Sequence, residues 1–252
     1  MPLMFTPEQR GQLRTDLLER AANDPRISAA AITGSAAADR EDIWSDIDLA
    51  FGVADAAEVQ RVLTDWTALM YDQHGALHHL DVMAGAWIYR VFLLPTTLQV
   101  DLAFVPAVEF RALGPNFRLL FGRENEPRHA PPQSPGDLIG LGWLYALHAR
   151  SCIARRKLWQ AEYMISGIRD HALALACIRY GLPSVHGRGI DQLPREVAAQ
   201  FRESLVRRLD SDELSRAFQV VTLRLLSEIE NVDQALAARL QETLIRLSEP
   251  TL

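Results

Sequence analysis

Asp46 and Asp48 stand two residues apart in a largely apolar stretch, residues 43–51, that is typical of a β-strand. Alternate side chains of a strand point to the same face, so we expect both carboxylates on one face and Ile47 and Leu49 on the other, toward a core. Two neighbouring carboxylates repel each other and gain nothing for stability. A divalent cation would remove that repulsion, and Mg²⁺ prefers carboxylate oxygens together with substrate phosphates. The pair therefore predicts a metal site.

A third acid, Asp101, lies between Val100 and Leu102 in a second strand-like stretch, residues 98–105. If this strand lies beside the one that carries the pair, three carboxylates converge on a site for two metal ions. Such a site aligns a hydroxyl for in-line attack on a phosphate.

Gly34 and Ser35 follow a short apolar strand expected over residues 27–33 and could hold that phosphate. Glycine lets the backbone approach closely, the serine hydroxyl can donate a hydrogen bond, and amides at a following helix N-terminus favour anions. Each feature alone has a structural explanation: a turn for the Gly-Ser pair, an exposed strand end for the acid pair, and a structural hydrogen bond for the lone acid. Their combination, in this order, favours phosphate chemistry.

Hydrophobic periodicity and turn residues predict the elements that position these groups. A first helix begins at Thr6, whose capping box is completed by Gln9, and ends at Asp24-Pro25. A second helix is expected over residues 56–71. The predicted strands cover residues 27–33, 43–51, 77–83, 87–94 and 98–105.

The composition changes at residues 127–136, where four prolines interrupt any periodic pattern. We place a domain boundary there and expect two domains, residues 1–130 and 131–252. Mixed strands precede the boundary and helices follow it. The predicted fold class is α+β, with a mixed twisted sheet flanked by helices in the first domain and a helical bundle in the second.

Helix signals dominate the second domain. Ser134 is expected to cap its first helix, and Asn231 with Gln234 to form the capping pair of its last. The predicted helices cover residues 135–157, 159–180, 194–209, 211–230 and 231–247.

The overall composition excludes several functional classes. With 252 residues, 48% hydrophobic and 23% charged, the chain resembles ordinary globular proteins and not disordered, collagenous or coiled-coil ones. Its 32 acidic and 26 basic residues give a net charge of -6, which makes nucleic acid an unexpected partner. The lack of a signal-like start and of a long apolar run, together with only two cysteines, predicts a cytoplasmic protein with no membrane partner.

The motif that these residues form resembles that of the polymerase-beta-type nucleotidyltransferase superfamily. The resemblance spans residues 25–106 and consists of Gly34-Ser35, the ten residues that follow, the sequence Ser45-Asp46-Ile47-Asp48, and Asp101. With its helical second half, the chain is similar to the antibiotic nucleotidyltransferases, which include aminoglycoside adenylyltransferases.

The resemblance implies transfer of a nucleoside monophosphate, usually AMP from ATP, to a hydroxyl of a small acceptor, with two Mg²⁺ ions as cofactors. It implies that Asp46 and Asp48 ligate both ions and that Asp101 ligates the catalytic one. Gly34 and Ser35 would hold the triphosphate. Some members of the family build the site across a dimer, so a homodimer stays open.

One departure from the family concerns the positive charge beside the phosphates. Many small members carry an arginine soon after the Gly-Ser pair, whereas three alanines precede Arg40 in this chain. Either Arg40 or a residue of the helical half must then neutralise the triphosphate. The candidates in the helical half are Arg155, Arg156 and Lys157, close to a predicted helix junction.

Glu162 is the candidate general base for the acceptor hydroxyl, because transferases of this shape generally take that base from a carboxylate near the acceptor. The alternative for Glu162 and the basic residues before it is an exposed cluster of helix ion pairs.

Three functional hypotheses follow. The first is AMP transfer to a small hydroxylated molecule such as an aminoglycoside, a cation that an acidic cleft would attract. The second keeps the chemistry but takes a protein acceptor, as antitoxin-type nucleotidyltransferases do. The third is a catalytically silent nucleotide-binding module, suggested by the missing early arginine. Activity on transfer RNA or as a polymerase is disfavoured by the negative charge.

Overall fold

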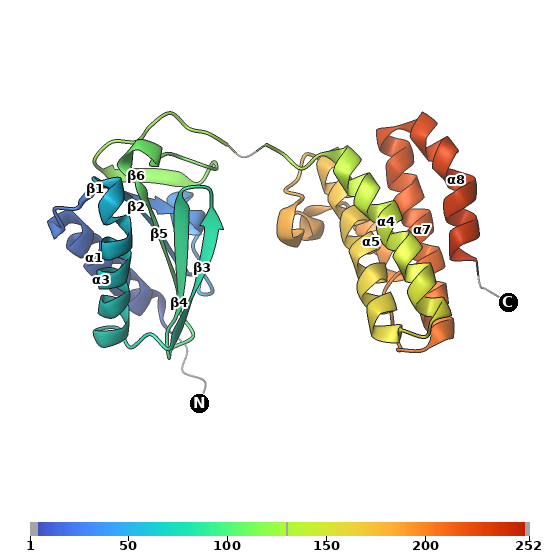
Figure 1. Ribbon diagram of the computed structural model, residues 1–252, viewed down its shortest axis with the longest axis horizontal. Coiled ribbons are helices and arrows are strands. Elements are labelled where there is room, and N and C mark those ends of the chain that lie inside the picture. The colour runs from blue at the N-terminus through green and yellow to red at the C-terminus, as the bar shows by residue number, and fades with distance from the viewer. Residues whose placement is uncertain (1–4, 130, 250–252) are drawn as a thin grey trace. The chain divides into compact units, whose positions relative to one another are not determined.

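The chain divides into two compact units, Met1–Pro131 and Pro132–Leu252 (Figure 1). The computed structural model describes residues 5–129 and 131–249. The first unit combines a six-stranded sheet with helices and the second is helical, so the predicted α+β class is confirmed. No helix in the described ranges is long and apolar enough to cross a bilayer.

The sheet of the first unit is mixed, with the spatial order β3-β4-β5-β2-β1-β6. Its strands are β1 (Ile27–Thr33), β2 (Ile47–Val53), β3 (His78–Ala84), β4 (Trp87–Leu93), β5 (Gln99–Pro106) and β6 (Phe117–Phe121). β2 and β5 run parallel, and the other neighbouring pairs are antiparallel. A parallel pair needs a long crossover connection, which the helix Val59–Asp72 and the β3–β4 hairpin provide.

The two faces of the sheet differ in what covers them. Helices α1 (Pro7–Asn23) and α3 (Val59–Asp72) cover one face, where large residues such as Phe51, Trp66 and Phe104 form the core (Figure 1). The other face carries small strand residues and a limited aromatic cluster; its buried members include Ala31, Ala50, Ala103, Trp87 and Phe110. The acids of β2 and β5 lie on this second face. Short helical turns complete the unit: α2 (Gly34–Ala37), η1 (Ala56–Glu58) and η2 (Ala107–Glu109).

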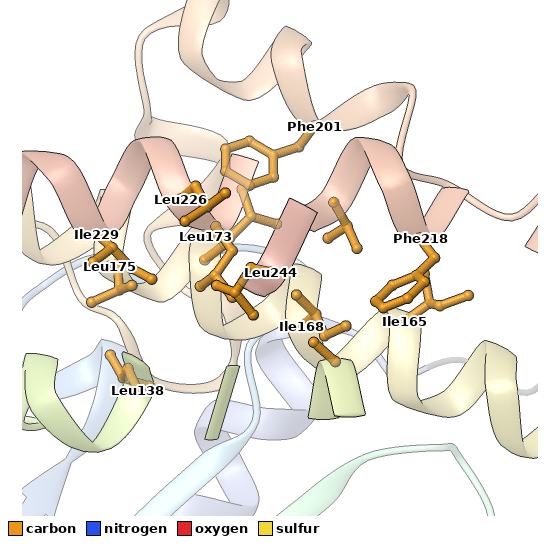
Figure 2. Packing of buried hydrophobic residues seen from close by; sticks show 14 of the residues in the cluster. Leu138, Ile165, Ile168, Leu173, Leu175, Phe201, Phe218, Leu226, Ile229 and Leu244 are labelled. Carbon is orange, nitrogen blue, oxygen red and sulfur yellow. The ribbon is translucent and has the colours of Figure 1, made fainter. Parts of the chain in front are cut away.

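Within the described residues, the second unit contains five α-helices. They pack around one apolar core, part of which Figure 2 shows. They are α4 (Pro135–Ala154), α5 (Leu158–Arg179), α6 (Arg195–Arg202), α7 (Ser211–Val232) and α8 (Gln234–Ser248), with 3₁₀ turns η3 (Val185–Gly187) and η4 (Ile190–Gln192). Ile165, Ile168, Phe218 and Leu226 contribute to this core from α5 and α7. The unit matches the predicted helical bundle.

In the first unit the predicted start of α1 is correct, whereas two strands differ from the prediction. The capping box of α1 is present, with Thr6 Oγ1 accepting from the Gln9 amide at 3.2 Å. The strand predicted over residues 43–51 instead begins at Ile47, because residues 42–45 form a hydrogen-bonded turn. β6 was not predicted at all; it is a five-residue edge strand paired with β1.

Two predictions for the second unit need correction. Asn231 does not cap the last helix: it lies inside α7, and Asp233 caps α8 by accepting from the Leu236 amide at 2.9 Å. The helix predicted over residues 194–209 ends at Arg202, because the segment after it is tied to α7. Ser134 does cap α4, as expected.

That tie centres on Glu213, which is only 7% exposed. Its carboxylate accepts from Arg216 Nε at 2.8 Å and from the Arg207 amide at 2.9 Å. The Arg216 hydrogen bond, followed by that of Arg207, lowers the pKa of Glu213 to about 2. Arg216 also donates to the Leu205 carbonyl, so one ion pair fixes the loop between α6 and α7.

We expect Glu213→Gln to lower the free energy of unfolding of the second unit by about 2 kcal/mol near neutral pH, because hydrogen bonds to the charged carboxylate are lost. The folded pKa lies below the ordinary 4.5, so this stabilisation is present above about pH 4.5 and disappears as the pH falls through about 2. Urea unfolding at pH 7 and at about pH 3 measures the difference between the variant and the wild type. Glu242→Gln breaks the exposed pair with Arg246 and should change stability little at either pH. A Glu213→Gln deficit equally large at both pH values would contradict this account.

Candidate functional site

Asp48 and Asp101 lie directly opposite each other in the parallel β2–β5 pair. The neighbours of Asp48 in the chain, Ile47 and Leu49, are buried on the helix-covered face, so both acids point to the other face. The sequence argument required these two strands to be adjacent, and they are. The two carboxylates, one near the start of each strand, are thereby held side by side.

Asp46 stands one residue before β2 and completes the group. Gln99 Nε2 donates to Asp46 Oδ2 at 3.1 Å, which ties this acid to the first residue of β5. Burial, and then the charge of Asp46, raises the pKa of Asp101 to about 6. Asp101 Oδ1 is buried and accepts no hydrogen bond from any described residue. The structure thus places Asp48 beside Asp101 in the sheet and brings the negative charge of Asp46 close to Asp101.

Gly34 brings the turn after β1 against this group. Its φ of +64° lies in the left-handed region that glycine adopts at little cost. A Cβ at this position would overlap Asp48 Oδ2 and lie 2.7 Å from Asp48 Cγ. A side chain at position 34 would therefore collide with the Asp48 carboxylate, and glycine is the residue that fits. Ser35 follows in α2, where its carbonyl accepts from the Arg40 amide at 3.0 Å.

Positive charge reaches this turn from two arginines. Arg40 is exposed, and its guanidinium is at the limit of hydrogen-bonding distance from Asn116, 3.5 Å. Arg118 on β6 donates to the Ala36 carbonyl at 2.9 Å and pairs with Asp39 at 2.8 Å. Sequence reasoning missed Arg118 because β6 was not predicted, and only the pairing of β6 with β1 places it here.

Tyr89 on β4 is a second residue that sequence reasoning missed. Burial, and then the charge of Asp101, raises the pKa of its phenol, so the hydroxyl lies within electrostatic range of Asp101. The signal of Tyr89 in the sequence is weak, since an aromatic residue in a strand is ordinarily a packing residue.

The donor set can be tested for its fit to Mg²⁺. Among the described residues, no three or more His, Cys, Asp or Glu side chains form a ready-made metal cluster. The acids nevertheless suit a hard cation, because they offer carboxylate oxygens. Asp101 has a buried oxygen with no hydrogen-bond partner among the described residues, and its negative charge is repelled by that of Asp46. Mg²⁺ commonly takes only one or two carboxylates and completes its shell with substrate phosphates and water. The residues therefore fit Mg²⁺ delivered with a phosphate.

The remaining predicted residues belong to the second unit. Arg155, Arg156 and Lys157 are exposed in the turn between α4 and α5, where Arg156 has a φ of +54°. None of the three forms an ion pair within the described ranges, so a cluster of helix ion pairs is not what places them there.

Glu162 is half-buried on α5 and takes part in a short polar chain. Its Oε1 accepts from Ser166 Oγ at 2.6 Å, and Arg169 donates to the same hydroxyl at 3.0 Å. The carboxylate is therefore held in place on α5, within the first two turns after the basic residues of the α4–α5 turn.

Comparison with protein-family models gives no match, and comparison with curated proteins gives none either. Among solved structures, the chain is similar to the crystal structure of an aminoglycoside 6-adenyltransferase from Bacillus subtilis. The TM-score is 0.40 and the sequence identity 11%, over 92% of this chain and 95% of that one. A likeness of this degree carries no functional assignment, which must come from the residues of the site.

Proposed function

We propose that the protein is a metal-dependent nucleotidyltransferase that moves AMP from ATP to a hydroxyl of a small molecule, with aminoglycosides and related antibiotics as the acceptor class. One observation carries the proposal: Asp48 lies opposite Asp101 in β2–β5, Asp46 is close enough to raise the pKa of Asp101, and Gly34 lies against Asp48. Such a group is not explained by packing, because placing negative carboxylates next to each other, with one of them largely buried, lowers stability.

The three acids would hold two Mg²⁺ ions. When bound, such ions neutralise the triphosphate and favour the deprotonated form of an attacking hydroxyl. Asp46 and Asp48 would serve both ions, and Asp101 the one nearer the acceptor. Gly34 and Ser35 would receive the triphosphate, because glycine lets the backbone of this turn lie directly against Asp48, so that phosphates held by the turn would be close to the metal-binding carboxylates.

The other predicted residues take the remaining roles in this proposal. Arg40 would contribute positive charge from the first unit, with Arg155, Arg156 and Lys157 as candidates from the second. Glu162 would accept the proton of the acceptor hydroxyl. In this proposal residues 1–130 form the catalytic domain and residues 131–252 form the domain that binds the acceptor.

The direct test is release of pyrophosphate from ATP and Mg²⁺ in the presence of a panel of hydroxylated antibiotics. We expect at least one acceptor to support release, and Asp46→Ala to abolish it because a charged metal ligand is lost. Asp65→Ala is a suitable control, since Asp65 is exposed and lies on α3, which covers the sheet face opposite to Asp48 and Asp101. No release with any nucleotide or acceptor would count against the proposal.

The same preparation separates the alternatives. Label transferred from ATP to a co-purified protein, with none on small molecules, would favour a protein-modifying enzyme of the antitoxin type. Nucleotide binding that is indifferent to Mg²⁺, without turnover, would favour a silent binding module. Cytoplasmic location and a homodimer stay predictions.

A further inference from the structure

Arg10 on α1 is a charged residue buried in the first unit, only 5% exposed. Its Nη1 donates to the Asp42 carbonyl at 2.6 Å and to the Ser45 carbonyl at 3.0 Å. Its Nε pairs with Glu41 at 3.2 Å. One side chain thus contacts three residues of the segment that leads into Asp46.

That segment is not held by apolar burial. Ile43 and Trp44, at its tip, are 58% and 69% exposed. Asp42 Oδ1 accepts from the Trp44 amide at 2.8 Å and from Ser45 Oγ at 3.1 Å, which fixes the shape of the turn. These bonds are internal to the turn, so they do not fix its position relative to the sheet. Arg10 links the backbone carbonyls of this turn to α1, whereas among the described residues Arg14 reaches only the Glu41 side chain at the start of the segment.

Burying a guanidinium in this place costs free energy, because the charge leaves water. An apolar residue would pack α1 against the sheet at lower cost, as Leu17 and Ala21 do further along the same helix. What the guanidinium adds is geometry: its planar fork directs Nη1 at both carbonyl groups while Nε faces Glu41. The second of these carbonyls belongs to the residue directly before Asp46.

We infer that Arg10 is a positioning residue, which anchors residues 41–45 so that the Asp46 carboxylate stays beside Asp101 and is available for a divalent cation. This inference rests on the proposed function. Gln99 holds the Asp46 side chain from β5, and Arg10 holds its backbone from α1. Groups that orient metal ligands commonly contribute about 10- to 100-fold to metal affinity.

The test compares Arg10→Met with Arg14→Met. Arg14 lies on the same helix and pairs with the same Glu41 at 2.6 Å, but no described hydrogen bond joins it to the Asp42 or Ser45 carbonyls. Binding of Mn²⁺ together with a non-hydrolysable ATP analogue is measured by electron paramagnetic resonance on the full chain. Amide hydrogen exchange over residues 42–48 is measured without ligand, and thermal melts set a temperature at which each variant is folded.

We expect Arg10→Met to weaken Mn²⁺ binding about tenfold or more and to speed exchange over residues 42–48, while Arg14→Met changes both only slightly. Arg10→Lys, which keeps the charge but not the fork, should fall between them and serves if Arg10→Met does not fold. Equal Mn²⁺ affinity in wild type, Arg10→Met and Arg10→Lys would overturn the inference and leave the proposed function standing. No Mn²⁺ binding by the wild type would overturn both.

Discussion

Asp101→Asn is expected to abolish nucleotidyl transfer and, at the same time, to stabilise the first unit. The variant keeps the shape of the side chain and removes a negative charge that is largely buried and repelled by that of Asp46. Asp101 Oδ1 also has no hydrogen-bond partner among the described residues. The pKa of Asp101 rises from 3.8 to about 6, so keeping the carboxyl ionised near pH 8 costs on the order of 2–3 kcal/mol of stability. Because the folded pKa is the higher one, that cost is absent below about pH 4 and complete above about pH 6.

Activity should fall by at least about 10³-fold, more than the 10- to 100-fold typical of groups that only orient metal ligands. Melting temperatures near pH 8 and pyrophosphate release are measured on the same samples. Asp81→Asn is the matched control: Asp81 is also a strand acid, but it pairs with Arg90 at 2.6 Å, so its loss should lower stability and spare activity. An Asp101→Asn protein that retains activity, or that is less stable than the wild type, would contradict the assignment of Asp101 to a ligand.

Gly34→Ala is expected to cause the second large loss of activity. An alanine here would need a φ near +64°, which costs about 1 kcal/mol, and its Cβ would overlap the Asp48 carboxylate. Either the turn or the carboxylate must move, and displacement of a reacting group by about 1 Å can cost about 100-fold in rate. We therefore expect a loss of activity of about that size or more, measured as kcat/KM for pyrophosphate release.

Gly85→Ala separates the two causes. Gly85 has nearly the same φ, +62°, but an added Cβ would meet nothing within 4 Å. It should show the backbone cost in a melting curve and keep its activity. If both variants lost activity alike, general destabilisation and not the contact with Asp48 would be responsible.

The sequence was sufficient where the pattern was local. Alternation placed Ile47 and Leu49 in the core and therefore Asp48 on the opposite face. The pairing of β2 with β5, which sets Asp101 beside Asp48, was only a condition of the sequence argument and comes from the structure. The capping box of Thr6 and Gln9 was equally visible, because both halves of it lie within four residues.

Features that depend on distant contacts were not predicted. Arg10 has the pattern of an ordinary residue of an amphipathic helix. Its burial follows from hydrogen bonds to the carbonyls of Asp42 and Ser45, which are 32 and 35 residues further along the chain. Arg118 joins the turn after Gly34 only because a short edge strand pairs with β1. Asn231 was expected to cap the last helix, but α7 continues to Val232, and this leaves Asp233 as the cap of α8.

The central claim is that Asp46, Asp48 and Asp101 hold divalent cations together with a nucleoside triphosphate. The most direct measurement is anomalous diffraction from Mn²⁺ in crystals that contain a non-hydrolysable ATP analogue. We predict Mn²⁺ peaks between these carboxylates, with the triphosphate beside Gly34 and Ser35. A bound nucleotide with no Mn²⁺ at the three acids, or with its phosphates away from Gly34, would contradict the claim.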